Sequence, residues 1–254
     1  MIKNRRRSLI DLLKRKPFMT IEELCQHLDV SPATIRRDLS LLESEGEILR
    51  LNGGAMYINK DGTEREMTNI PHVEEKLRIA KAAAALVKEG DTIFIDSGST
   101  NQLIAEQLMN HTNFTVITNS LEIAYQLNSK KDKRGVSVII CGGTLGEGNA
   151  HSIAGPVAEK MISMFRANIC FLGTSGFDIK QGVTDPHLTL TRVKQNMIEH
   201  SNKVYLVTDH SKFGIINTAF VCPLERLTHI ITDADAPADD INYIRSKGVG
   251  VTLV

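Results

Sequence analysis

The sequence predicts an α/β protein of two parts. Residues 1–57 read as short helices followed by a hairpin, the pattern of a helix-turn-helix segment with a β-hairpin wing. In residues 72–254, short apolar runs alternate with helical stretches, which indicates a doubly wound, mostly parallel sheet covered by helices. Between them, residues 58–71 (INKDGTEREMTNIP) are polar and have no apolar period, so we expect a linker.

The composition narrows the class of protein. The chain has 254 residues, 42% hydrophobic and 24% charged, with zero formal net charge. It has no signal peptide and no run of about 18 apolar residues, so we expect a cytoplasmic protein. The four cysteines and eight histidines are scattered, and neither a metal nor a cofactor is expected. Residues 1–16 hold seven lysines and arginines against one acid, which favours a polyanionic partner.

A capping box starts the second helix of the first part. Thr20 and Glu23 have the T-x-x-E spacing, which predicts a helix from Ile21 to about Leu28. A tight turn at residues 29–30 follows. Ser31 is then a good N-cap and Pro32 suits the first helical position, so the spacing is that of a helix-turn-helix.

The next helix has two unlike faces. Ile35, Leu39 and Leu42 fall on one side and should pack inward. The opposite side shows small residues, hydroxyls and two guanidinium groups, which can approach base edges and phosphates closely. A solvated surface is the alternative for these arginines. Asp38 is interpreted as structural, because a carboxylate facing phosphate would repel it.

A wing should follow this helix. Gly46 is a predicted C-cap, and EILRL, NGG and AMYI form a hairpin with Arg50 near its tip. The guanidinium of Arg50 would reach a phosphate or the minor groove. The candidate DNA-binding residues are Ser31, Ala33, Thr34, Arg36, Arg37, Ser40 and Arg50.

The second part carries small polar residues after its predicted strands. The strands are predicted at residues 92–95, 114–117, 136–140, 167–172, 203–207, 229–232 and 249–254. DSGST (96–100), TNS (118–120), GG (142–143) and GTSG (173–176) each follow one of them, and such turns share the carboxyl edge of a doubly wound sheet, where ligands bind. Exposed amides at a helix start bind anions. For Ser99 the alternative is a capping role, since Ser99 and Gln102 have the S-x-x-Q spacing.

The expected ligand is small and phosphorylated. Neither a dinucleotide fingerprint nor a phosphate loop of the G-x-x-x-x-G-K type occurs, so ATP and NAD are disfavoured. Lys194, in a helix beginning near Thr189, and Lys212, in the loop DHSKFG, are candidate cationic partners. The alternative for both is the surface, where most lysines lie.

The run SPATIRRDLSLLESEGEILRLNGGA resembles the N-terminal signature of DeoR-type bacterial transcriptional regulators, and the similarity continues to the end of the chain. The resemblance implies an effector domain similar to ribose-phosphate isomerases that binds phosphorylated sugars. It also implies that the effector is bound by Asp96, Ser97, Gly98, Ser99, Thr100, Asn119, Gly142, Gly143, Gly173, Asp185, Lys194 and Lys212. One departure is that Gln195, and not arginine, follows Lys194.

We therefore expect a repressor of a carbohydrate-utilisation operon that binds double-stranded operator DNA as a homodimer or homotetramer. The alternative is an active sugar-phosphate isomerase with an appended DNA-binding domain. Asp178 or Asp185 would be its base and Lys194 its electrophile. The paired-acid and glycine-rich stretches of those enzymes are not found in GTSGFDIKQGVTD, which favours a protein without catalysis.

Overall fold

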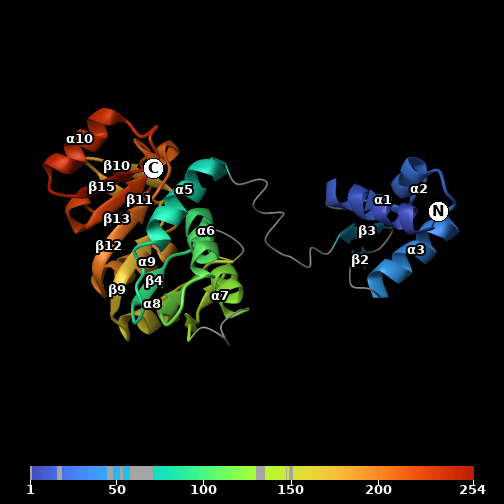
Figure 1. The fold of residues 1–254 in the computed structure, drawn as a ribbon, viewed down its shortest axis with the longest axis horizontal. Coiled ribbons are helices and arrows are strands. Elements are labelled where there is room, and N and C mark those ends of the chain that lie inside the picture. Colours follow the sequence, from blue (N-terminus) through green and yellow to red (C-terminus); the bar gives the residue numbers. More distant parts are fainter. Residues whose placement is uncertain are drawn as a thin grey trace. The chain divides into compact units, whose positions relative to one another are not determined.

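Two units make up the computed structural model, Met1–Pro71 and His72–Val254, and each is described by itself (Figure 1). The structure describes residues 2–15, 19–44, 48–51, 54–57, 71–129, 135–146, 148 and 151–254. All of the predicted linker 58–71 except Pro71, and the predicted C-cap Gly46, lie outside these residues.

The first unit packs three helices against a small antiparallel sheet. Its helices are α1 (Ile2–Arg15), α2 (Ile21–Leu28) and α3 (Pro32–Ser44), and its strands are β1 (Met19–Thr20), β2 (Ile48–Leu51) and β3 (Gly54–Tyr57). The strand order is β1-β3-β2. The sequence did not predict β1, whose Met19 pairs with Ala55 of β3. Ile35, Leu39 and Leu42 are buried as predicted.

Local hydrogen bonds explain where α2 and α3 begin. The predicted capping box is confirmed: Oγ1 of Thr20 accepts from the Glu23 amide at 3.2 Å, and Oε2 of Glu23 accepts from the Thr20 amide at 3.0 Å. Asp29 ends α2 in the left-handed conformation. Oγ of Ser31 then accepts from the Thr34 amide at 3.4 Å, which makes Ser31 the N-cap of α3.

A parallel sheet of seven strands forms the centre of the second unit. Its order is β15-β14-β12-β9-β4-β5-β6, and every pair is parallel. The strands are β4 (Thr92–Ile95), β5 (Thr115–Thr118), β6 (Ser137–Ile140), β9 (Ala167–Leu172), β12 (Ser201–Val207), β14 (His229–Thr232) and β15 (Gly250–Leu253). All seven predicted strands are confirmed, with ends shifted by up to two residues. The strand order reverses between β4 and β9, where such sheets bind ligands.

Helices and short antiparallel strands complete this unit. The helices are α5 (Val73–Ala84), α6 (Ser99–Leu108), α7 (Leu121–Asn128), α8 (Pro156–Ser163), α9 (Leu188–Glu199) and α10 (Ala238–Ser246), with 3-10 turns η2 (His210–Lys212) and η3 (Leu224–Arg226). The sequence did not predict the hairpin of β7 (Thr144–Leu145) and β8 (Ile153–Ala154). It also missed a sheet of order β10-β11-β13, formed by Gly176–Asp178, Gly182–Asp185 and Ala219–Cys222. The domain is thus a doubly wound sheet with a small antiparallel sheet added.

Three of the four cysteines belong to the core of the second unit. Burial raises the pKa of Cys141 and of Cys222 to about 12, and it also raises the pKa of Cys170. All four are free thiols, and Cys25, on α2 of the first unit, is half-buried. Within the described ranges, no helix combines the length and the apolar character needed to span a bilayer.

Candidate functional site

One face of α3 is open to solvent. Ser31, Ala33, Arg36, Arg37 and Ser40 are exposed, and Thr34 is half-buried. Neither arginine forms an ion pair with a described residue. Ser40 donates its hydroxyl to the Arg36 carbonyl at 2.9 Å. Arg50 lies in β2 opposite Ala55, and its side chain is outside the described part of the chain.

Asp38 is on the buried side of the same helix. Only 2% of this residue is exposed. Oδ2 accepts from Nε of Arg5 at 2.6 Å, and Oδ1 from Nε of Arg6 at 3.4 Å. The hydrogen bond to Asp38 raises the pKa of Arg5. The structural interpretation of Asp38 is confirmed. Two cations of the basic segment 1–16, Arg5 and Arg6, are therefore bound to Asp38 within the first unit.

The loops at the switch point between β4 and β9 are joined by Asp96. This carboxylate is fully buried. Oδ1 accepts from the Ser97 amide at 2.8 Å, while Oδ2 accepts from the Gly173 amide at 3.2 Å and from Nζ of Lys194 at 2.5 Å. A Cβ at Gly173 would lie 3.3 Å from the Asn101 side chain and from the Ser97 carbonyl oxygen. This close packing accounts for glycine there.

Lys194 is buried beneath these loops. Only 4% of it is exposed, so the surface alternative is wrong for this lysine. Nζ also donates to the Gly173 carbonyl at 2.9 Å and lies 3.6 Å from Oδ2 of Asp185. Burial acts to lower the pKa of Lys194, but the two carboxylates outweigh it and the pKa is raised. The charge of Lys194 is therefore already balanced by protein groups.

The start of α6 differs from the prediction. The N-cap is Gly98, at φ 129°, and no side chain caps the helix. The predicted capping box of Ser99 and Gln102 is thus wrong, because glycine makes the turn and Ser99 is already the first helical residue. No described side chain accepts a hydrogen bond from the amides of the first turn. Beside them, Oδ1 of Asn119 accepts from the Ser97 amide at 2.9 Å.

Gly142 and Gly143 follow β6 and pack against α8 and β8. The Gly142 amide lies 3.0 Å from Sδ of Met161. Gly143 has φ 151°, and a Cβ there would be 2.5 Å from the carbonyl oxygen of Ala154. Lys212 is half-buried in η2, at the end of β12. The structure thus brings Asp96, Gly173, Asp185 and Lys194 into one cluster and joins Ser97 to Asn119. In the described part of the chain, Lys212 makes no hydrogen bond or ion pair with these residues.

Two groups at this edge were missed from the sequence. Asn101 is fully buried and donates to the Phe171 carbonyl at 3.3 Å, while its Oδ1 has no partner among the described residues. Asp209 is the second residue after β12, and its carboxylate lies 3.6 Å from Nζ of Lys76. Its place after a strand, like that of Asp96, is a signal that could have found it. Gln195, where arginine was expected, donates to the carbonyls of Phe220 and Val221.

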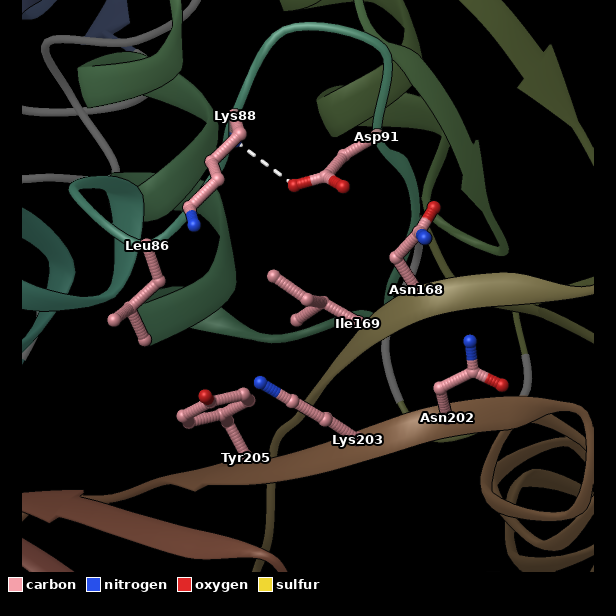
Figure 2. Close-up of a pocket in the computed structure, with 8 residues that line it drawn as sticks. All are labelled: Leu86, Lys88, Asp91, Asn168, Ile169, Asn202, Lys203 and Tyr205. Atoms are coloured by element: carbon pink, nitrogen blue, oxygen red, sulfur yellow. Dashed lines mark hydrogen bonds between the residues drawn. The ribbon is translucent and has the colours of Figure 1, made fainter.

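A pocket of about 320 Å³ lies at the opposite, amino-terminal edge of the sheet (Figure 2). Its polar lining includes Lys88, Asp91, Asn168 and Lys203. The Asn168 side chain accepts from the Thr92 amide at 2.8 Å, and Asp91 accepts from the Lys88 amide at 2.9 Å. The pocket contains no residue of the predicted effector site.

A helix-turn-helix unit joined to an α/β unit with polar loops at one sheet edge defines a two-domain transcriptional regulator. Residues 5–61 match the DeoR-like helix-turn-helix domain, and residues 71–234 match the DeoR C terminal sensor domain. The chain belongs to the DeoR family of transcriptional regulators.

Relatives span nearly the whole chain. The HTH-type transcriptional regulator GolR of Listeria innocua is 37% identical over 90% of this chain and 89% of its own. The glycerol-3-phosphate regulon repressor of Escherichia coli is 37% identical over 98% of each chain. Among solved structures, ribose 5-phosphate isomerase A of Methanocaldococcus jannaschii has 18% identity and a TM-score of 0.40 over 54% of this chain and 53% of that one. This likeness carries no conclusion about chemistry.

Proposed function

We propose that this protein is a cytoplasmic, sequence-specific DNA-binding repressor of a carbohydrate-utilisation operon, and that a phosphorylated sugar or sugar alcohol controls its DNA binding. The observation that carries the proposal is the exposed face of α3, where Arg36 and Arg37 have no ion pair with any described residue. The names of two relatives support a role in carbohydrate utilisation: one is a glycerol-3-phosphate regulon repressor and the other a putative aga operon transcriptional repressor.

The DNA-reading step uses α3 in the major groove. Arg37 donates two hydrogen bonds to a guanine edge, and Ala33 leaves room for the approach. Ser31 and the amides at the helix start hold phosphate, together with Thr34, Arg36 and Ser40. Arg50 of the wing contacts the flanking backbone or minor groove.

Two copies are needed for specificity, because one helix reads too few base pairs. We propose that residues 1–57 bind DNA, that 58–71 connect the domains, and that 72–254 bind the effector and assemble the chain into a homodimer or homotetramer. The effector favours one arrangement of the oligomer and so changes the affinity for DNA. Coupling of this kind is typically about 1–3 kcal/mol.

The effector site lies at the carboxyl edge of β4, β5, β6, β9 and β12. Since Lys194 is balanced by Asp96 and Asp185, we place the phosphate on the amides of Ser99 and Thr100 at the start of α6, with Lys212 as its cationic partner. Asp96, Asp185, Lys194 and Gly173 position these loops from beneath. Ser97, Gly98, Asn119, Gly142 and Gly143 form the rest of the proposed rim.

The protein acts without catalysis. Both candidate bases make structural hydrogen bonds: Oδ1 of Asp178 accepts from the Lys180 and Gln181 amides at 2.8 Å. Oδ1 of Asp185 accepts from the His187 amide at 3.0 Å. These bonds support the binding role over the isomerase alternative. An assay for isomerisation of ribose and fructose phosphates tests whether the protein is an enzyme. Measurable isomerisation would favour the isomerase alternative over the binding role.

The test of the whole proposal is a DNA-binding titration with and without effector. A duplex selected from a random library by the protein is labelled and titrated by fluorescence anisotropy, with each phosphorylated sugar added in turn. We expect sequence-specific binding that one phosphorylated compound alters. Binding that does not distinguish the selected duplex from a scrambled one would contradict the proposal.

A further inference from the structure

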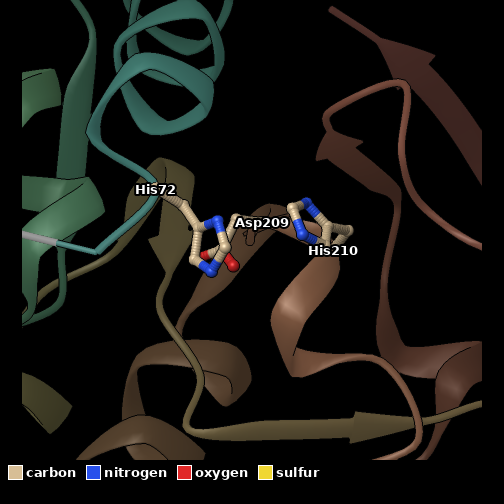
Figure 3. Close-up of side chains that lie close together, drawn as sticks. All are labelled: His72, Asp209 and His210. Carbon is tan, nitrogen blue, oxygen red and sulfur yellow. The ribbon is translucent and has the colours of Figure 1, made fainter.

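Near the carboxyl end of β12, the adjacent residues Asp209 and His210 meet His72, which is far from them in the sequence (Figure 3). His72 directly precedes α5, Asp209 follows β12, and His210 begins η2. One donor atom from each lies within 4.8 Å of the others, and the two imidazole rings meet edge to face with centroids 4.6 Å apart. Asp209 is buried, His210 is half-buried and His72 is exposed, so a solvent path reaches the group.

The geometry points to a binding site for one divalent metal ion of the zinc class, held by His72, Asp209 and His210. Two imidazole nitrogens and one carboxylate are a common protein ligand set for such ions, with a fourth position left for water. This site does not depend on the proposed function, and the scattered histidines gave no motif for it in the sequence.

A carboxylate behind His210 fixes its ring. Nδ1 of His210 is 2.9 Å from Oδ1 of Asp233, and the His210 amide donates to Oδ2 of the same residue at 2.7 Å. Asp233 is fully buried. Imidazoles that bind metals usually donate their other N–H to a carboxylate in this way, which orients the free nitrogen toward the ion. Nε2 of His210 is therefore the atom presented to the metal.

The charges around Asp209 select the kind of metal. Oδ1 is occupied by the amide and hydroxyl of Ser211. Oδ2 faces Nζ of Lys76 at 3.6 Å, and the positive charge of Lys212 also acts on this carboxylate, so a cation at this oxygen must compete with two ammonium groups. Magnesium and calcium bind mainly through oxygen and would obtain one contested carboxylate. A metal that bonds well to neutral imidazole has two further ligands, which favours zinc, nickel or cobalt.

The backbone at His72 is an independent indication. His72 is in the left-handed conformation, at φ 56° and ψ 42°, and its side chain makes no capping bond to α5. Non-glycine residues in this region are uncommon and cluster at functional sites. The conformation places the ring beside His210, and a bound metal would tie the start of α5 to η2.

The test is a zinc titration of the full-length protein by isothermal calorimetry, after chelator treatment and without effector or DNA. We expect one ion per chain and a rise in melting temperature. His72→Asn keeps a residue that tolerates the left-handed backbone but removes the imidazole, so it should fold normally and bind zinc at least about tenfold more weakly. His210→Ala should lose affinity similarly. His187→Ala, which removes an exposed histidine elsewhere in the unit, is the matched control.

Asp233→Asn tests the positioning of His210. It should weaken zinc binding about 10–100-fold, and cobalt absorption spectra should show altered coordination in the variant. The proposal is overturned if the wild type takes up no zinc, or if His72→Asn and His210→Ala bind zinc as the wild type does. It is equally overturned if inorganic phosphate, and not zinc, raises the melting temperature in a way that depends on His210.

Discussion

Nε of Arg5 on α1 donates to Oδ2 of Asp38 on α3 at 2.6 Å. The bond ties the recognition helix to the first helix from its buried side, while Arg37, the preceding residue, is exposed. Two consecutive residues of α3 thus have different roles. Asp38 holds the helix in place, and Arg37 is available to a partner.

Replacing Arg37 by Ala should weaken binding to the selected duplex by about 5- to 150-fold, since a bidentate contact to a base is worth roughly 1–3 kcal/mol. The preference for guanine at one position of the duplex should also be lost. Fluorescence anisotropy with the selected duplex, and with duplexes in which each guanine is substituted in turn, measures both. Arg192→Ala removes an exposed arginine from the second unit and should change neither. Equal effects of the two variants would exclude Arg37 as a reader.

Replacing Asp38 by Asn should weaken DNA binding, although the side chain at this position does not contact DNA. The neutral amide loses the charge-assisted bonds to Arg5 and Arg6, so α3 is held less firmly. The variant should also lower the melting temperature of the first unit, which Arg37→Ala should not do. Calorimetry beside the binding assay separates the two variants. An Asp38→Asn protein that melts as the wild type does would show that these bonds contribute nothing to stability.

Lys194→Met should destabilise the second unit by about 3–5 kcal/mol, because two buried carboxylates lose their counter-charge. Adding Asp96→Asn to this variant should restore part of the loss. Urea unfolding followed by tyrosine fluorescence is suitable, since Tyr125, Tyr205 and Tyr243 are all in this unit. Lys180→Met, at an exposed lysine, serves as control and should change stability by less than about 0.5 kcal/mol.

Gly143→Ala should be more destabilising than Gly146→Ala. Both glycines have positive φ, at 151° and 94°, so both variants carry backbone strain of roughly 1–3 kcal/mol. Only at Gly143 would the new Cβ meet a backbone atom, the Ala154 oxygen at 2.5 Å; nothing lies within 4 Å at Gly146. Thermal unfolding of the two variants compares them. Equal losses would mean that β8 moves away without cost.

A phosphorylated effector should raise the melting temperature, because a ligand that binds only the folded state stabilises it by about 2.7 kcal/mol at one hundred times its dissociation constant. Lys212→Ala should reduce this stabilisation, whereas Lys180→Ala should leave it intact. A thermal-shift screen of phosphorylated sugars and sugar alcohols, in the presence of a chelator, measures it. Full stabilisation of Lys212→Ala would remove this lysine from the proposed site.

The central sheet was predictable because its strands are short apolar runs between helical stretches, as in TIFI and ANICFL. The small sheet of β10, β11 and β13 was not, since Gly176–Asp178 and Gly182–Asp185 are three and four residues long and begin with glycine. Their pairing with Ala219–Cys222 decides the structure there.

The exposed face of α3 could be predicted from the local periodicity of the sequence, and the structure agrees with that prediction. The position of Lys194 did not follow from any local pattern, because its partner Asp96 is 98 residues away in the sequence. Lys194 is buried where two distant carboxylates, Asp96 and Asp185, converge on it. His72 and Asp209 likewise come together through the fold alone.

The burial of Cys141, Cys170 and Cys222 has a practical consequence. Their thiols stay protonated near neutral pH and are shielded from solvent, so they should resist maleimide dyes. Cys25, half-buried on α2, is left as the preferred attachment point. A fluorophore introduced there without any mutation would report from beside the recognition helix while effectors are added to the other unit.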